Sequence, residues 1–404
     1  MMGGHKERKH SLLSPSNAHQ WMACTPSALL GRQFPDKAGT SAAEGTLAHE
    51  LAELKVRNYF YSVDFGKRKL TAAIKKLRED ENWNEEMMGY TDEYLDYVKS
   101  VGMKFRSSPT VKLESYLSLD AYIPHLSDED EAGGTADCIL IGEGVLHVID
   151  FKYGKSPDGR VKAEWNPQML LYALGAYEMY RILYTFKTVR LSIVQPRLPD
   201  GISEWECTLD EMLQFGEYVK ERAALAIKGG GEFAPAPKTC KYCRARGRCK
   251  ARAEKNVELA FLVGTDPNLL TNEELGRYLL KGRDVARWLS DAQDVALADC
   301  LAGKEVPGWK AVEGRGTRDW TDMDKAFGAL TSNGISDTIL WERKPLSLAQ
   351  VEKVVGKKDF QELVGDMVVK KPGKPALVEE TDKRPAITNK VSAAEAFKEE
   401  EWHE

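Results

Sequence analysis

Residues 134–152 carry the stretch that decides the fold: Gly134-Thr135-Ala136-Asp137-Cys138-Ile139-Leu140, the turn Gly142-Glu143-Gly144, and then Val148-Ile149-Asp150-Phe151-Lys152. Two short apolar runs, about 135–141 and 145–151, flank a glycine-rich turn, which is typical of a β-hairpin. The hairpin places Asp137 and Asp150 on adjacent strands, and Asp150 and Lys152, two residues apart, on one face of a strand. Two carboxylates and a lysine in this arrangement suit metal-assisted cleavage of a phosphodiester.

The chemistry of this group favours a hard divalent cation. Carboxylate oxygens are the ligands that Mg²⁺ or Mn²⁺ takes, with substrate phosphate completing the set, and a nearby ammonium can stabilise developing charge. The alternative is a solvated strand face on which Asp and Lys alternate. Against it, Asp150 follows the apolar pair Val148-Ile149, and Gly133-Gly134 lets the backbone approach closely just ahead of Asp137.

The surrounding pattern predicts alternating helices and strands. Apolar spacing predicts helices over about 41–59, 83–105, 165–184 and 210–228, and strands over about 111–117 and 188–195. A longer helix is expected at about 273–301. The order indicates an α/β fold.

The ordered acids and lysine resemble the core of the PD-(D/E)XK nuclease superfamily, in its RecB-like exonuclease branch. That resemblance implies a restriction-endonuclease-like core, a mixed central sheet flanked by helices, with Asp137, Asp150 and Lys152 as catalytic residues. Two more motifs are similar to those of the branch. The segment Glu44–Leu51 resembles the early helix whose histidine, here His49, is a metal ligand beside Asp137 and Asp150, and the spacing Gln168-x-x-x-Tyr172 matches an element that contacts DNA.

Glu114, on the first predicted strand, is a candidate ligand for the same metal or a second one, with a solvated strand glutamate as the alternative. His49 on its own would be read as an ordinary helix histidine, and Gln-x-x-x-Tyr is common by chance. Their order around the strands makes them support one another.

A second constellation is the cysteine set Cys240, Cys243 and Cys249, in a C-x2-C-x5-C pattern. Cysteines this close indicate metal ligation, and Cys24 is the best candidate for a fourth ligand. The layout resembles the iron–sulfur variety of the branch, found in AddB-type and CRISPR-associated RecB-like exonucleases, which implies a [4Fe–4S] cluster of structural role. Zn²⁺ is the alternative at four thiolates.

The loop around these cysteines is basic, from Lys238 to Arg252, and Tyr242 lies within it. Lys241 and Arg244 are therefore candidates for contacts to DNA, in a groove that follows a single strand. The alternative is a solvated loop whose cations balance the thiolates.

Composition limits the classes of function. The chain has 404 residues, 42% hydrophobic and 29% charged, with a net charge of −5, so simple coating of DNA is disfavoured but a nuclease with a local basic groove is not. No apolar run is long enough for a membrane span and no secretion signal follows the basic start, so a cytoplasmic protein with no membrane partner is expected. No P-loop sequence is present, so any helicase would be a separate chain.

The expected layout is a flexible segment 1–23, a nuclease domain 24–252 closed by the cysteine-bound cluster, an additional α/β region 253–371 of unknown role, and a disordered acidic tail 372–404. The expected function is a metal-dependent DNA exonuclease of phage or mobile-element replication or recombination, acting on single strands or DNA ends. Its partners would be DNA and a helicase, single-strand-binding or recombination protein. The rivals are a non-catalytic DNA-binding scaffold and a structure-specific endonuclease of the same superfamily.

Overall fold

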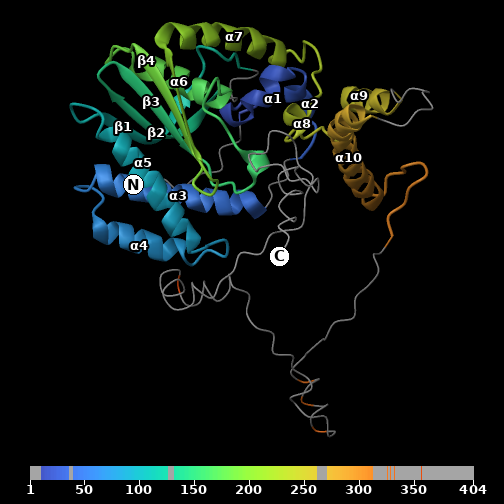
Figure 1. Cartoon of the computed structure of the whole chain (residues 1–404), viewed down its shortest axis with the longest axis horizontal. Coiled ribbons are helices and arrows are strands. Elements are labelled where there is room, and N and C mark those ends of the chain that lie inside the picture. The colour runs from blue at the N-terminus through green and yellow to red at the C-terminus, as the bar shows by residue number, and fades with distance from the viewer. Residues whose placement is uncertain are drawn as a thin grey trace, which may run out of the picture. The chain divides into compact units, whose positions relative to one another are not determined.

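The computed structural model describes residues 11–35, 40–125, 132–261 and 271–312, and beyond them the single positions 325, 328, 332 and 356. The chain divides into two units, Met1–Val312 and Glu313–Glu404. All named helices and strands belong to the first unit, which is a mixed α/β fold with one central sheet (Figure 1). Most of the expected region 253–371 and the whole tail 372–404 lie outside the described residues.

Five strands form the sheet in sequence order: β1 (Thr110–Ser118), β2 (Gly133–Gly142), β3 (Val145–Phe151), β4 (Thr188–Val194) and β5 (Ile202–Thr208). Neighbours are antiparallel except β3 and β4, which are parallel and are connected through helix α6 (Pro167–Tyr180). The hairpin and its two flanking strands are confirmed. The edge strand β5 was not predicted from the sequence, because it is short and mostly polar and only one of its residues is buried.

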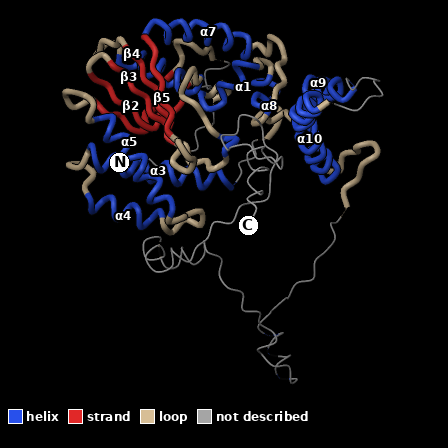
Figure 2. The backbone as a smooth tube through the Cα atoms, viewed as in Figure 1, coloured by secondary structure: helices blue, strands red, loops and turns tan. Residues whose placement is uncertain are grey.

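Helices cover both faces of the sheet (Figure 2). One face packs against α3 (Thr40–Phe60) and α5 (Glu86–Gly102), with α4 (Lys67–Leu77) against α3. The other face packs against α6 and α7 (Leu209–Ile227). Because β3 lies between two helical layers, Leu146–Phe151 is buried throughout, which is why its sequence reads as a continuous apolar run around Asp150.

Side chains of β1 and β2 alternate between the two faces of the sheet, and this alternation is interrupted at one point. Val111 and Leu113 face the α3/α5 core, but Leu117, an even number of residues further along, belongs to the α6/α7 core. Glu114 lies between them with a left-handed φ of 45°, and it has no Cα partner in a ladder that otherwise pairs β1 with β2 from Thr110 to Ser118. The position opposite this irregularity is Asp137, so the interruption occurs where the candidate site begins.

The N-terminal segment differs from the expected flexible stretch 1–23. Residues 11–23 are packed: Leu13 and Trp21 are each 1% exposed, and the Trp21 indole N–H donates to the Ser14 carbonyl at 3.1 Å. The short helices η1 (Pro15–Asn17) and α1 (Ala18–Ala23) lie against α6 and α7. Arg222 of α7 donates to the Met22 carbonyl at 2.7 Å. Large apolar side chains in a polar stretch therefore anchor it to the core.

The remaining described helices are α2 (Ser27–Arg32), the 3-10 turn η2 (Pro157–Gly159), α8 (Pro237–Cys240), α9 (Lys250–Phe261) and α10 (Asn272–Leu301). The expected helix 273–301 is confirmed as α10, which begins with a capping box between Thr271 and Glu274. The expected boundary at residue 252 falls inside α9, and both α9 and α10 belong to the unit that contains the sheet. Within the described ranges, no helix is both long and apolar enough to cross a bilayer.

Candidate active site at the ends of β2 and β3

The two predicted acids meet where β3 ends beside the middle of β2, between α3 on one face of the sheet and α6 on the other. Asp137 Oδ1 lies 3.2 Å from His49 Nδ1 on α3. Its other oxygen accepts a 2.7 Å hydrogen bond from the backbone N–H of Phe151 on β3. The strand hairpin and α3 thus bring together residues that are 88 positions apart in the chain.

Asp150 is 3% exposed and has two side-chain neighbours. Lys152 Nζ lies 3.2 Å from its Oδ1 and 3.0 Å from its Oδ2, and Gln168 Nε2 donates to Oδ1 at 3.3 Å. Oδ2 is buried, and among the described residues its one close polar partner is the ammonium of Lys152, with which it forms an ion pair and not a hydrogen bond. An atom of this kind can accept a further ligand.

Helix α6 places the Gln-x-x-x-Tyr pair. Asn166 caps the helix by accepting from the Met169 backbone N–H at 3.2 Å, and Pro167 follows at the first helical position. Gln168 is therefore in the first turn, next to the end of β3. It also donates to the Tyr172 hydroxyl at 3.3 Å, one turn later on the same face. The structure thus joins both residues of the motif to Asp150.

Electrostatics shift the pKa values of His49, Asp137 and Lys152 towards their charged forms. Burial lowers the pKa of His49, but the charge and hydrogen bond of Asp137 outweigh it, so that pKa is raised. Burial would raise the pKa of Asp137, but His49 and Lys152 keep it below its usual value. Burial lowers the pKa of Lys152, yet Asp150 and Asp137 raise it above the ordinary value. Lys152 is therefore an ammonium at neutral pH.

Asp150 differs from these three groups. Burial raises its pKa, Lys152 opposes that effect, and the negative charge of Asp137 adds to it. Two buried carboxylates side by side favour any added positive charge.

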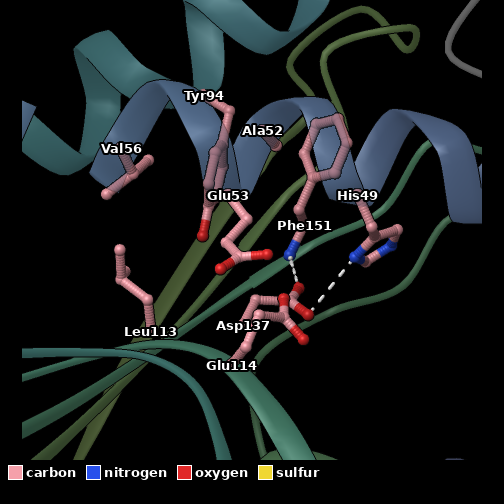
Figure 3. Close-up of a pocket in the computed structure, with 9 residues that line it drawn as sticks. All are labelled: His49, Ala52, Glu53, Val56, Tyr94, Leu113, Glu114, Asp137 and Phe151. Carbon is pink, nitrogen blue, oxygen red and sulfur yellow. Dashed lines mark hydrogen bonds and ion pairs between the residues drawn. The ribbon is translucent and has the colours of Figure 1, made fainter. Parts of the chain in front are cut away.

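A cleft opens next to Asp137 on the side of α3, with about 210 Å³ of empty space that includes open solvent. Figure 3 shows three carboxylates gathered in it, those of Glu53, Glu114 and Asp137. Burial, followed by the charges of Asp137 and Glu53, raises the pKa of Glu114 to about 8. Glu114 is thus part of the site and not a solvated strand residue.

Two residues of this cleft were missed by the sequence reasoning. Glu53 lies one turn after His49 on α3, and the spacing of four residues could have revealed it. Tyr94 of α5 is 2% exposed, and its hydroxyl lines the cleft without a hydrogen-bond partner (Figure 3). No local signal in the sequence around Tyr94 points to the cleft.

The residues that could hold a divalent cation are His49, Asp137, Asp150 and Glu114. Within the described parts of the chain, no group of three or more His, Cys, Asp and Glu side chains is already arranged with the spacing of a metal site. The donor set is nevertheless of the right chemistry, one imidazole with hard carboxylate oxygens, and it includes the oxygen of Asp150 that has no hydrogen bond.

The four predicted cysteine ligands lie in one region. Contacts between α1 and α8 bring Cys24, at the end of α1, towards Cys240, and Cys24, Cys240 and Cys243 are buried. Burial, followed by the neighbouring thiols of Cys240, Cys249 and Cys24, raises the pKa of Cys243 to about 11. The thiols are close enough to affect one another's pKa values. As at the carboxylates, however, no three of them within the described residues are already arranged with the spacing of a metal site.

The side chains of the basic loop fall into two groups, those that form ion pairs with carboxylates of α10 and those that do not. Arg246 Nε lies 2.8 Å from Asp291, Arg252 Nη1 lies 2.6 Å from the same carboxylate, and Arg248 pairs with Asp299, so α10 neutralises three of its cations. Arg244 and the Tyr242 ring are exposed, and Lys241 Nζ lies 5.2 Å from the centre of that ring. The arginines that face α10 are therefore paired within the protein, and the DNA contacts of Lys241 and Arg244 remain predictions.

The chain belongs to the family described as "Protein of unknown function (DUF2800)", whose model matches residues 10–385. A "putative exonuclease" from Eubacterium rectale is similar over 68% of this chain and 98% of its own, with 12% identity and a TM-score of 0.32. The protein SSO0001 is similar over 50% of this chain and 85% of its own, with 18% identity and a TM-score of 0.26. These scores are too low to establish a shared fold.

Proposed function

We propose that this protein is a divalent-metal-dependent deoxyribonuclease that removes nucleotides from DNA ends. The observation that carries the proposal is the convergence of Asp137, Asp150 and Lys152 at one end of the sheet, with His49 on one side and Gln168 on the other. A scaffold that only binds DNA gains nothing from burying two carboxylates next to each other, because the desolvation and repulsion cost free energy of folding.

Mg²⁺ or Mn²⁺ would be held by His49, Asp137 and Asp150, with Glu114 as a further candidate. The buried Oδ2 of Asp150, which lacks a hydrogen bond, supports this fit. When bound, the ion would polarise the phosphoryl group and lower the pKa of a water molecule.

The chain's own residues have separate roles. Lys152 stays charged, so it stabilises negative charge on the phosphate and does not take a proton. Asp137 stays ionised because His49 and the Phe151 N–H bind it. Gln168 orients Asp150 and also donates to Tyr172, which is buried, so Tyr172 would support Gln168 and Gln168 would be the member of the pair that DNA approaches.

The finer assignments rest on the resemblance of the motifs to RecB-like exonucleases. They comprise the exonuclease mode and a setting in phage or mobile-element replication or recombination, with a separate helicase, single-strand-binding or recombination protein as partner. The ordered set of His49, the two acids, Lys152 and the Gln-x-x-x-Tyr pair favours this branch over a site-specific endonuclease.

The cysteines would hold a [4Fe–4S] cluster, with Zn²⁺ as the alternative, at Cys24, Cys240, Cys243 and Cys249. The fit is supported by the burial of three of the thiols and by their effect on one another. Bound there, the group would join the N-terminal segment to the region after the sheet and supply stability, not chemistry. Iron and zinc analysis of anaerobically purified protein, beside Cys24→Ser, distinguishes the two metals and detects an empty site.

The nuclease is tested with end-labelled linear DNA, single- and double-stranded, in Mg²⁺, Mn²⁺ or EDTA. Wild type is compared with Asp150→Asn and Lys152→Ala, and with the matched control Asp96→Asn, whose carboxylate on α5 is 73% exposed. We expect metal-dependent loss of label in wild type and the control, and a loss of at least about 100-fold in both site variants. Equal cleavage by Asp150→Asn, or none by folded wild type loaded with its metals, would refute the proposal.

A further inference from the structure

Trp165 has an unusual environment for a large aromatic residue. It lies in the loop that connects β3 to α6, its side chain is 51% exposed, and its φ of 46° is left-handed. Bulky residues rarely adopt that conformation, and it persists only where the surroundings hold it. Its ring lies 4.8 Å from the ring of Trp205 on β5, so one face packs on the protein and the side chain remains open to solvent.

The loop that carries Trp165 is fixed along the hairpin of β4 and β5. Arg160 donates to the Pro199 and Asp200 carbonyls at 2.5 and 2.8 Å. The Val161 backbone N–H donates to Gln195 Oε1 at 2.8 Å, and the Ala163 N–H donates to Ser203 Oγ at 3.0 Å. A loop with these bonds presents its side chains in a set position, as a binding surface requires.

The same loop carries three cations, Lys155, Arg160 and Lys162, against two acids, Asp158 and Glu164, and it connects two parts of the candidate active site. Lys155 and Lys162 are exposed, and neither forms an ion pair with another described side chain. The loop starts directly after Lys152 and ends at Asn166, two residues before Gln168, which contacts Asp150. Trp165 precedes Gln168 by three residues, so their Cα atoms are at most about 11 Å apart.

We infer that residues 153–166 form a binding platform for single-stranded DNA, on which Trp165 stacks with a base while Lys155 and Lys162 contact backbone phosphates. The inference deepens the proposed nuclease function and rests on it for the identity of the strand. Exposed aromatic rings beside cations bind single strands without sequence preference, because every unpaired base has a face to stack. Bases inside a duplex are already stacked, so the platform selects single strands or frayed ends.

Binding is measured by fluorescence anisotropy in EDTA, with a 15-nucleotide oligothymidylate and a duplex of the same length. We expect Trp165→Ala to weaken single-strand binding about 5- to 100-fold, Trp165→Phe to retain most of it, and duplex binding to change little. The matched control is Trp309→Ala, which removes a 66% exposed tryptophan elsewhere in the unit and should leave both affinities unchanged. Circular dichroism confirms that each variant is folded.

A second measurement tests the cations separately from the ring. Replacing Lys155 and Lys162 together by Ala should lower the slope of log K against log salt by about 1.4 for the single strand, about 0.7 for each lost phosphate contact. An unchanged slope, equal affinity in Trp165→Ala, or an equal loss in Trp309→Ala would overturn the platform. Because these assays exclude divalent metal, binding that depends on Trp165 without cleavage in the metal assay would refute the nuclease and leave the platform standing.

Discussion

Replacing Glu114 by Gln should stabilise the metal-free protein at alkaline pH and not at acidic pH. Burial and the charges of Asp137 and Glu53 raise the pKa of Glu114 to about 8, against an ordinary 4.5. Between these values the folded protein holds a proton that the unfolded chain has lost. Because the folded state then binds more protons, the free energy of unfolding falls as pH rises from about 4.5 to about 8.

The size of the effect follows from the same two values. A difference from 4.5 to about 8, at about 1.4 kcal/mol for each pH unit, gives an upper limit of about 5 kcal/mol. Glu114 is partly exposed, and solvent screening reduces the expected gain to about 2 kcal/mol. Gln is close to isosteric with Glu and cannot ionise. The variant therefore does not lose the stability that wild type loses when Glu114 gives up its proton at high pH.

Urea denaturation in EDTA at pH 5 and pH 9 measures the gain. Glu114→Gln should equal wild type within about 0.5 kcal/mol at pH 5 and exceed it by about 2 kcal/mol at pH 9. The control Glu217→Gln, a glutamate of α7 that is 70% exposed, should show no such difference. A variant that is no more stable than wild type at pH 9 would show that the three carboxylates of the cleft do not repel one another as described.

Three further substitutions test other parts of the site and fold. Gln168→Ala removes a hydrogen bond to Asp150, so metal-dependent cleavage should fall about 10- to 100-fold while the midpoint of urea denaturation barely moves. An unchanged cleavage rate would show that Gln168 of α6 has no part in catalysis. Gly134→Ala places a Cβ 2.9 Å from Pro15 Cγ and 3.1 Å from Tyr172 Cε1, so it should cost about 1–3 kcal/mol by urea denaturation, whereas Gly89→Ala on α5, with nothing within 4 Å, should cost nothing. Arg252→Met removes the buried guanidinium that lies near two α10 carboxylates, Asp284 and Asp291, so amide hydrogen exchange in residues 272–301 should become faster. The control Lys250→Met removes only an exposed ion pair. Equal exchange rates in the two variants would contradict a stabilising role of the Arg252 pairs.

The sequence was sufficient for the parts of the fold that depend on local pattern. The hairpin of β2 and β3, the strand β4 and the helices α3, α5, α6, α7 and α10 lie within a few residues of their expected positions, because turn residues and apolar periodicity are local signals. The packed segment 11–23 and the edge strand β5 were not predicted, because tertiary contacts and not local periodicity order them. The place of Tyr94 in the cleft was not predicted for the same reason, since no residue pattern near it in the sequence indicates a cleft.

Several departures from local rules lie near the candidate site, and others lie elsewhere in the described residues, such as the left-handed φ values of Glu143 and Asp200. Glu114 and Trp165 both adopt left-handed φ values, and the Asp150 and Tyr94 side chains each bury an oxygen without a hydrogen bond. Each departure costs free energy of folding, and the strain at one such residue is on the order of 1–3 kcal/mol. The four residues just named lie around Asp137 and Asp150 or close in sequence to Gln168, which contacts Asp150. A site that binds cations and a polyanionic strand would relieve the repulsion and fill the open oxygens at once, which is why the costs can persist together.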